Sequence, residues 1–493
     1  MLSRRTLLAA LLACASAQTK LSVSISAGSP PVNYVAPEYL SFNLDWHYDG
    51  EEWPAWRASS VANMSLSEPN LKYLTAALAP AHLRVGGSEG DLVQYVLPGF
   101  PCALPPNQNA TANPVPFCLD ASRWAAVNAF AAEAKITLAF GLNAMQGRRN
   151  ASAPMDTANL AAFLRATAAA GVGAHNTLPF LELGNELEFK VIPSIYAADA
   201  IRVAGLIADA WPQPAQRPRL VGNDENPDPS YWATMLPLLP AGTLAAASWH
   251  EYVGYGLDPA LPTKCLDASF LDGVKGTAAN QAAAAAKAKF SGALWVGETA
   301  LAWHSGRNGT TNAFASSFWY VVQLGALAAT HAVQCRQTLI GGYYELIDKT
   351  TRSPNPDFYT ALLWKKTMGT GVLAATFAAA AAPQLRLFAH CTAGGRGVTL
   401  AFANLDATAA YELDVSGAGG AGLAAPRDEY HLSAVGGDVF AQAAALNGKP
   451  LAYSGPGTLD PLAPVAVTDP AAPLILQPRT LGFVVFPDAE NAC

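Results

Sequence analysis

Short apolar runs alternate with longer helix-like segments along most of this chain. Eight runs rich in apolar, β-branched or aromatic side chains each end in small or polar residues. They cover residues 39–45, 82–87, 136–143, 180–186, 219–224, 246–252, 294–299 and 337–346. Segments with amphipathic helical spacing lie between them, at residues 125–134, 158–170, 197–211 and 314–329. This alternation predicts a parallel sheet, and eight units close a (β/α)8 TIM barrel.

After Lys365 the pattern changes to short alternating runs separated by Gly and Ala turns. Residues 384–392, 397–405, 411–415, 429–432 and 480–487 read as strands of an antiparallel β-sandwich. We therefore expect the barrel over residues 36–375 and the sandwich over residues 376–493. Residues 18–35 hold one earlier strand, with Leu21, Val23 and Ile25 alternating with polar residues, and we expect it to join the sandwich.

The first residues have the layout of a cleavable signal peptide. Arg4 and Arg5 precede an apolar run over residues 7–13, and small residues follow at 15–17, which predicts removal of residues 1–17. Residues 11–14 also fit a bacterial lipid-attachment site. Asn-x-Ser/Thr acceptors favour a eukaryotic secretory route instead; they are Asn63, Asn109, Asn150 and Asn308. We expect a secreted, extracellular or lysosome-like location and glycosylation.

Composition narrows the choice of partner. The net charge is −7 with 14% charged residues, which argues against nucleic acid and anionic membranes as partners. After residue 17 no stretch reaches the roughly 18 apolar residues of a membrane helix. Without a Cys-x-x-Cys or His-x-x-x-His pair, we expect no metal and no organic cofactor. Six of the seven cysteines remain after removal of the signal peptide, and an oxidising compartment permits disulfides.

Polar residues at the ends of apolar strands form the candidate site, because a parallel barrel works at the carboxyl ends of its strands. They are Asp45, Ser88, Glu89, Asn143, Asn185, Glu186, Asp224, His250, Tyr252, Glu298 and Tyr344. A single such residue is more often a helix cap than a catalyst. Glu186 and Glu298 change that weighting, because each ends an apolar strand and they lie 112 residues apart, on predicted strands 4 and 7.

Two facing carboxylates are what glycoside hydrolysis requires. A gap of about 5 to 5.5 Å between them predicts retention through a covalent intermediate. We assign the proton and the acid/base role to Glu186, because the adjacent Asn185 can bind a sugar hydroxyl beside the leaving oxygen. Glu298 is then the nucleophile, and the Tyr252 hydroxyl can donate to it.

Several motifs also resemble a known family. They are Leu-Arg-Val-Gly-Gly at 83–87, Phe-Gly-Leu-Asn-Ala at 140–144, Glu-Leu-Gly-Asn-Glu at 182–186, Trp-His at 249–250, Val-Gly-Glu-Thr at 296–299, Arg-Gln at 336–337, Pro-Asp at 356–357 and Leu-Arg-Leu-Phe at 385–388. In order and over nearly the whole chain, they resemble glycoside hydrolase family 79, the heparanase and β-glucuronidase group of the retaining clan A.

The resemblance implies the same two catalytic glutamates and a set of substrate contacts. It implies sugar contacts by Asp45, Asn185, Tyr252 and Tyr344, and a backbone contact to a uronate carboxylate at Gly341 and Gly342. It also implies a disulfide between Cys391 and Cys493. Cys102 and Cys118 can close a loop of their own. The predicted substrate-binding set further includes Ser88, His250 as the partner of a carboxylate, and Trp303 on a bulky rim.

The predicted function is a retaining β-glucuronidase-type hydrolase acting on glycans or glycosides that contain glucuronic acid. An alternative is heparanase-like endo cleavage of heparan-type chains. The acidic loop with Asp224, Glu225 and Asp228 argues against it, because a sulfated polyanion would meet like charge. An alternative of another class is a non-catalytic glycan-binding protein on a hydrolase scaffold, although both glutamates are present.

Overall fold

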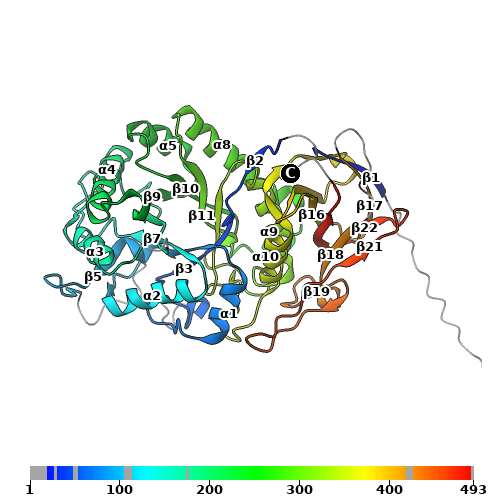
Figure 1. Cartoon of the computed structure of the whole chain (residues 1–493), viewed down its shortest axis with the longest axis horizontal. Helices are drawn as coiled ribbons and strands as arrows, with labels where there is room; N and C mark the ends of the chain where they lie inside the picture. The colour runs from blue at the N-terminus through cyan, green and yellow to red at the C-terminus, as the bar shows by residue number, and fades with distance from the viewer. Residues whose placement is uncertain are drawn as a thin grey trace, which may run out of the picture.

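The chain folds into a barrel and a second, all-β part that lie side by side (Figure 1). The computed structural model describes residues 19–26, 30–47, 54–104, 114–173, 177–417, 423 and 426–489. The predicted signal peptide, Asn109 and Cys493 lie outside the described residues. No helix within the described residues is both long enough and apolar enough to span a membrane.

Eight strands form a closed barrel, which confirms the predicted fold class. In chain order they are β3 (Leu40–Asp45), β4 (His82–Gly86), β7 (Thr137–Leu142), β8 (Phe180–Leu183), β9 (Arg219–Glu225), β10 (Ala246–Tyr255), β11 (Ala293–Trp303) and β12 (Val333–Arg336). All neighbours pair in parallel, and β12 closes the barrel onto β3. The carboxyl ends of all eight strands therefore meet at one face.

The predicted eighth strand, residues 337–346, is wrong. The strand is β12, and residues 337–346 form the turn that follows it. Leu339, Ile340 and Leu346 in this turn are fully buried. A buried loop needs apolar side chains just as a buried strand does. The composition of residues 337–346 is therefore the same as that of a strand, which is why the sequence predicted one.

Helices surround the barrel. They are α1 (Pro69–Ala77), α2 (Ala121–Glu133), α3 (Ala158–Ala169), α4 (Pro193–Ala210), α5 (Pro229–Met235), α6 (Leu261–Lys264), α7 (Ala268–Leu271), α8 (Gly273–Lys287), α9 (Phe314–Leu327) and α10 (Pro356–Thr367). Unlike the others, α9 is buried on nearly every side because it lies between the barrel and the second part. A side chain at Gly325 would overlap Phe388, so glycine permits this close packing.

Two sheets make up the second part. One has the order β14 (Ala375–Phe377), β1 (Thr19–Ile25), β17 (Tyr411–Ser416) and β22 (Leu474–Leu476). The larger sheet contains β2 (Asn33–Tyr34), β13 (Met368–Leu373), β15 (Leu385–Thr392), β16 (Val398–Asn404), β23 (Thr480–Phe486), β18 (Arg427–Ala434), β19 (Ala444–Leu446), β20 (Lys449–Pro450) and β21 (Val465–Val467). The remaining strands, β5 (Gln94–Tyr95) and β6 (Cys118–Leu119), pair on the barrel.

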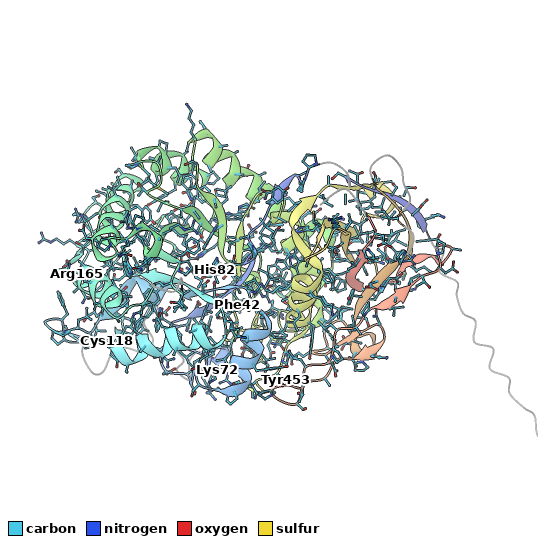
Figure 2. All side chains as sticks on the ribbon, in the orientation of Figure 1. Phe42, Lys72, His82, Cys118, Arg165 and Tyr453 are labelled. Carbon is cyan, nitrogen blue, oxygen red and sulfur yellow. A yellow bond between two sulfur atoms is a disulfide. The ribbon has the colours of Figure 1, made fainter. Side chains whose placement is uncertain are left out.

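The N-terminal strand β1 ties the two ends of the chain together. Its Leu21, Val23 and Ile25 are buried, and it pairs in parallel with β17 and antiparallel with β14. A second link joins the parts near α1, where the Tyr453 hydroxyl donates to Asn70 at 2.8 Å. Figure 2 shows Tyr453 beside α1, which carries Lys72.

The disulfide between Cys102 and Cys118 is present, with Cα atoms 5.9 Å apart. Cys391 is also disulfide-bonded. Its predicted partner, Cys493, lies outside the described residues. Cys265 and Cys335 are free and buried.

Candidate active site

A cavity of about 580 Å³ opens at the carboxyl ends of the barrel strands. Its lining residues are Glu186, Asn226, Pro227, His250, Glu251, Tyr252, Thr277, Glu298, Trp303, His304 and Tyr344. Both predicted catalytic glutamates are among them. The cavity lies where parallel barrels carry their chemistry.

Glu186 lies in the turn that follows β8. Its backbone has a φ of +50°, in the left-handed region that non-glycine residues seldom adopt. The Glu186 backbone N–H donates to the carbonyl of Asp224 at 2.8 Å, which fixes this turn to the end of β9. The Glu186 side chain remains 30% exposed and can reach a ligand.

Glu298 lies within β11, and both of its carboxylate oxygens are bound. The Tyr252 hydroxyl donates to Oε1, as the sequence predicts, and Arg84 donates to Oε2 at 3.1 Å. The preceding residue must be glycine, because a Cβ at Gly297 would overlap the carboxylate of Asp224. The carboxylate of Glu298, the predicted nucleophile, is thus held in one orientation, with the positive charge of Arg84 beside it.

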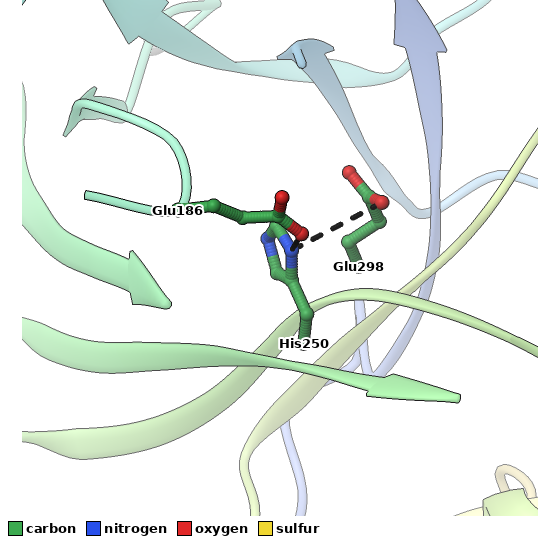
Figure 3. Close-up of side chains that lie close together, drawn as sticks. All are labelled: Glu186, His250 and Glu298. Atoms are coloured by element: carbon green, nitrogen blue, oxygen red, sulfur yellow. Dashed lines mark hydrogen bonds and ion pairs between the residues drawn. The ribbon is translucent and has the colours of Figure 1, made fainter. Parts of the chain in front are cut away.

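The two glutamates are close enough to act on one bond (Figure 3). The facing side-chain oxygens of Glu186 and Glu298 and a ring nitrogen of His250 all lie within 4.8 Å of one another. This spacing is that of a retaining glycosidase rather than an inverting one, whose carboxyl groups lie roughly 6.5 to 9.5 Å apart.

The same three side chains include the ligand types that a divalent cation uses. Each of them is already engaged with protein groups: Glu186 with His250, and Glu298 with Tyr252 and Arg84. A cation would have to displace these hydrogen bonds. Glycoside hydrolysis by two glutamates needs no such change, because it uses these side chains with their present hydrogen bonds.

His250 connects Glu186, the predicted acid/base residue, to a third carboxylate. Its Nδ1 lies 2.8 Å from Glu186 Oε1, and its Nε2 lies 3.0 Å from Asp224 Oδ2. Burial alone would lower the pKa of His250, but the negative charges of Asp224 and Glu298 raise it well above its ordinary value. The imidazole is therefore protonated at neutral pH.

His250 in turn affects the pKa of the predicted acid, Glu186. Burial raises the pKa of Glu186, but the hydrogen bond to His250 and its positive charge outweigh burial and lower the pKa below its ordinary value. The two side chains share a 2.8 Å hydrogen bond, across which the proton that we assign to Glu186 can pass.

Arg84 is the functional residue for which the sequence suggested no role. It is 1% exposed, and its guanidinium binds Glu182 at 2.6 Å, Asn185 at 2.8 Å, Asp224 and Glu298. Arginine in the middle of the apolar run at residues 82–87 is the signal that could have revealed it. A buried charge in a barrel strand must be paired.

Asn185, Ser88 and Asp45 surround this network. The Asn185 amide oxygen accepts from Arg84, and its amide nitrogen donates to Ser88 Oγ at 3.2 Å. Asp45 accepts from Gln337. Burial and the nearby charge of Glu298 raise the pKa of Asp45 well above its ordinary value. Asp45 can therefore donate a hydrogen bond to a sugar hydroxyl.

The turn after β12 contains Gly341, Gly342 and Tyr344. Tyr344 lines the cavity, whereas the Gly341 backbone N–H donates to Glu345 at 2.7 Å. This N–H is occupied, so the predicted contact of Gly341 with a uronate needs correction. Gly342 packs against the ring of Tyr344.

A second turn, after β11, offers further backbone donors, and the contact predicted at Gly342 stays a prediction. His304, Ser305 and Gly306 have φ values of +61°, +62° and +72°. Within the described residues, none of their backbone N–H groups is donated to another protein group. Successive N–H groups in such a turn can form an anion-binding concavity. Trp303, which precedes this turn, is 50% exposed at the rim and stacks on Tyr255.

The acidic segment at residues 224–228, which the sequence suggested is a loop, begins with the last two residues of β9 and does not present the negative charge that we expected. Asp224 is fully buried and paired with Arg84 and His250. Glu225 is also fully buried, and burial raises its pKa well above the ordinary value. Asp228 caps the N-terminus of α5. Repulsion by these carboxylates therefore does not argue against sulfated substrates.

The sequence profile of the glycosyl hydrolase family 79 N-terminal domain matches residues 21–325. The chain belongs to glycoside hydrolase family 79. Heparanase-like protein 1 from Arabidopsis thaliana is 31% identical over 513 residues, covering 92% of this chain and 91% of that protein. Baicalin-beta-D-glucuronidase from Scutellaria baicalensis is 30% identical, covering 88% and 85%. The family assignment confirms the predicted resemblance and makes this family 79 chain a glycosidase.

A solved structure supports the fold of this family 79 protein. The 4-O-alpha-L-rhamnosyl-beta-D-glucuronidase from Fusarium oxysporum superimposes with a TM-score of 0.64 at 15% identity, over 94% of this chain and all of that one. At this identity the likeness concerns the fold.

Proposed function

We propose that this family 79 glycosidase removes β-linked glucuronic acid from glycans or glycosides with retention of configuration. The observation that carries the proposal is the pair of glutamates within 4.8 Å, one bound by Tyr252 and Arg84 and the other by His250. The names of two relatives, a baicalin β-glucuronidase and a heparanase-like protein, support a glucuronide as the sugar.

The turn at His304, Ser305 and Gly306 supports recognition of a uronate. It follows the strand of the nucleophile, and His304 lines the same cavity as Glu298. Its backbone N–H groups could hold the sugar carboxylate without a lysine or arginine. A glucoside has a neutral hydroxymethyl group in that place and would lose this interaction.

In the first step, a Glu298 oxygen attacks the anomeric carbon while the bond to the leaving oxygen breaks. Glu186 delivers a proton to that oxygen, and a glycosyl ester on Glu298 forms. That proton reaches Glu186 from His250 across their hydrogen bond, so after this step the Glu186–His250 pair holds one proton fewer, and Asp224 lies at the other ring nitrogen of His250. Arg84 and Tyr252 orient the attacking carboxylate.

The second step reverses these roles. Glu186, now without its proton, takes one from water, and the water oxygen attacks the anomeric carbon. The bond to Glu298 breaks and its carboxylate is restored. Two inversions at the same carbon give a product with the configuration of the substrate.

The test is release of para-nitrophenol from the β-glucuronide and the β-glucoside, with the wild type and Glu298→Ala compared. We expect turnover of the glucuronide, little turnover of the glucoside and no turnover by the variant. Turnover of the glucoside at an equal rate would overturn the uronate assignment while leaving the glycosidase assignment intact.

We also propose that the protein is secreted and glycosylated. The signal-peptide pattern and the Cys102–Cys118 disulfide support an oxidising compartment. Asn63, Asn150 and Asn308 are exposed and lie in acceptor motifs. For the protein from a eukaryotic host, N-terminal sequencing tests removal of the signal peptide, and a fall in mass after removal of N-glycans tests glycosylation.

A further inference from the structure

One carboxyl group in the catalytic cavity is used by neither chemical step. Glu251 lines the cavity between His250 and Tyr252, yet it is 4% exposed. Its Oε2 is buried and has no hydrogen-bond partner among the described residues. A buried polar group without a partner is costly, so such a group in a cavity points to a ligand.

Strand geometry places Glu251 on a different wall from its neighbours. Successive side chains of a strand point in opposite directions, so Glu251 points away from the catalytic centre that His250 and Tyr252 face. The residues that line the cavity also include Thr277 of α8 and Asn226 and Pro227, which follow β9. The Glu251 backbone is fixed, since its carbonyl accepts from Thr299 Oγ1 at 2.7 Å.

Each of two neighbouring carboxyl groups accepts at least one hydrogen bond, although Glu188 Oε2 has no partner, whereas no hydrogen bond to the Glu251 carboxyl is found among the residues that the structure describes. Glu225 accepts from Asn223 and Gln281, and Glu188 accepts from Asn226 at 2.9 Å. Burial alone raises the pKa of Glu251 to about 8. Below that pH the group is a neutral acid, which offers one O–H donor and an acceptor oxygen.

The reaction geometry says which part of a substrate would meet this wall. Glu186 delivers its proton to the leaving oxygen, so the leaving group lies on the Glu186 side of the scissile bond. Asn226, Pro227, Glu251 and Thr277 line the cavity with Glu186. Trp303 offers an exposed ring face at the rim of the same cavity.

We propose that Glu251 is a specificity-determining residue of the leaving-group site, where its carboxyl hydrogen-bonds a neutral, hydroxyl-bearing ring. The inference rests on the proposed function, through the assignment of Glu186 as the acid. The ring can belong to a sugar or to a hydroxylated aromatic aglycone, because both carry hydroxyl groups at the ring edge and offer a ring face that Trp303 can contact.

The test compares wild type, Glu251→Leu and Glu251→Gln on glycosides that share one sugar and differ in the leaving group. The leaving groups are para-nitrophenol, a polyhydroxylated aromatic ring and a second sugar. We expect Glu251→Leu to lower kcat/KM by about tenfold or more for the hydroxylated rings, as for loss of a buried hydrogen bond. We expect a change of less than about twofold for para-nitrophenol, whereas Glu251→Gln, which keeps a donor and an acceptor, retains most activity throughout.

A matched control is Glu225→Gln, which alters a similarly buried carboxyl on the adjacent strand that does not line the cavity. Turnover of a dinitrophenyl glycoside, limited by hydrolysis of the glycosyl-enzyme, should be unchanged in all variants. If Glu251→Leu does not fold, Glu251→Asp withdraws the carboxyl by one methylene and should show a weaker loss of the same kind.

The two hydroxylated leaving groups distinguish the source of the ring, because the natural one should show the larger loss. Equal losses for every leaving group, or no loss for any, would overturn the inference. A wild type that cleaves glucosides rather than glucuronides would overturn the proposed sugar instead. The comparison of leaving groups would then be made on the glucoside.

Discussion

Glu186 and His250 share a hydrogen bond of 2.8 Å, and only the imidazole of the pair is fully buried. Asp224, 3.0 Å from the other ring nitrogen, holds the positive charge of that imidazole. Because these two groups interact directly, they are expected to titrate as a pair. The pH dependence of the reaction should reflect the pair.

His250→Gln should move the basic limb of kcat/KM to lower pH. In the wild type, the proton of the pair is lost only well above the ordinary pKa of histidine, because Asp224 and Glu298 raise the pKa of His250. In the variant, Glu186 must keep the proton by itself, and a carboxyl group loses it at lower pH. A basic limb at unchanged pH would contradict the shared-proton account. His331→Gln is the matched control, because it alters a fully buried histidine that does not line the catalytic cavity.

The loss of kcat/KM in Glu186→Ala should depend on how strongly departure of the leaving group requires protonation. We expect kcat/KM to fall by about 10²- to 10⁴-fold for a poor leaving group such as phenol, and far less for dinitrophenol. Added azide should restore turnover and yield a β-glycosyl azide, because a small anion can take the place of the activated water. Equal losses for both leaving groups would contradict the acid role.

Tyr252→Phe should slow the chemistry more than it weakens binding. The variant removes the hydroxyl that donates to Glu298 Oε1, so kcat should fall by about 10²-fold, with a smaller change in KM. Tyr255→Phe is the matched control, because Tyr255 stacks on Trp303 at the rim. A similar loss in both variants would show that the hydroxyl of Tyr252 has no special role.

Arg84→Met should destabilise the fold as well as abolish activity. It would leave Glu182 and Asp224 buried without their cation, which costs about 3 to 5 kcal/mol of unfolding free energy. Lys72→Met breaks the exposed pair with Glu133 and should cost less than about 1 kcal/mol. Urea unfolding of both variants measures the difference, and equal midpoints would contradict the account.

Glu251→Gln should gain stability relative to the wild type as the pH rises. Burial raises the pKa of Glu251 from 4.5 to about 8, so its protonated form stabilises the fold at low pH. That contribution is lost as the pH rises from 4.5 through 8, by roughly 1 to 4 kcal/mol. Glutamine does not titrate, so the contribution of residue 251 to the unfolding free energy of the variant does not change with pH. A constant difference in unfolding free energy between about pH 4 and about pH 9 would contradict the buried, unpaired carboxyl.

The barrel could be predicted because its strands are buried on both faces and therefore read as apolar runs. Seven of the eight predicted runs contain the observed strands or overlap them. The eighth failed because the buried turn after β12 has the composition of a strand. The alternation in β1 likewise predicted one buried face, but a pattern of this kind does not identify the pairing partner.

The positions of the two glutamates could be predicted because an unpaired carboxylate at the end of a buried strand is energetically costly. The network around them could not, because its members come from distant strands. Arg84 on β4 meets Asp224 on β9 and Glu298 on β11 only in the folded barrel. The same folding buried Asp224 and Glu225, and so removed the negative surface that the sequence suggested.

The most direct test of the central claim is to trap the covalent intermediate. A glucuronosyl fluoride with a second fluorine on the neighbouring ring carbon forms the ester quickly and hydrolyses slowly. We predict that peptide mass mapping finds the sugar on Glu298, and that Glu298→Gln takes up none. A label on another residue, or turnover with inversion and no trapped ester, would contradict the account.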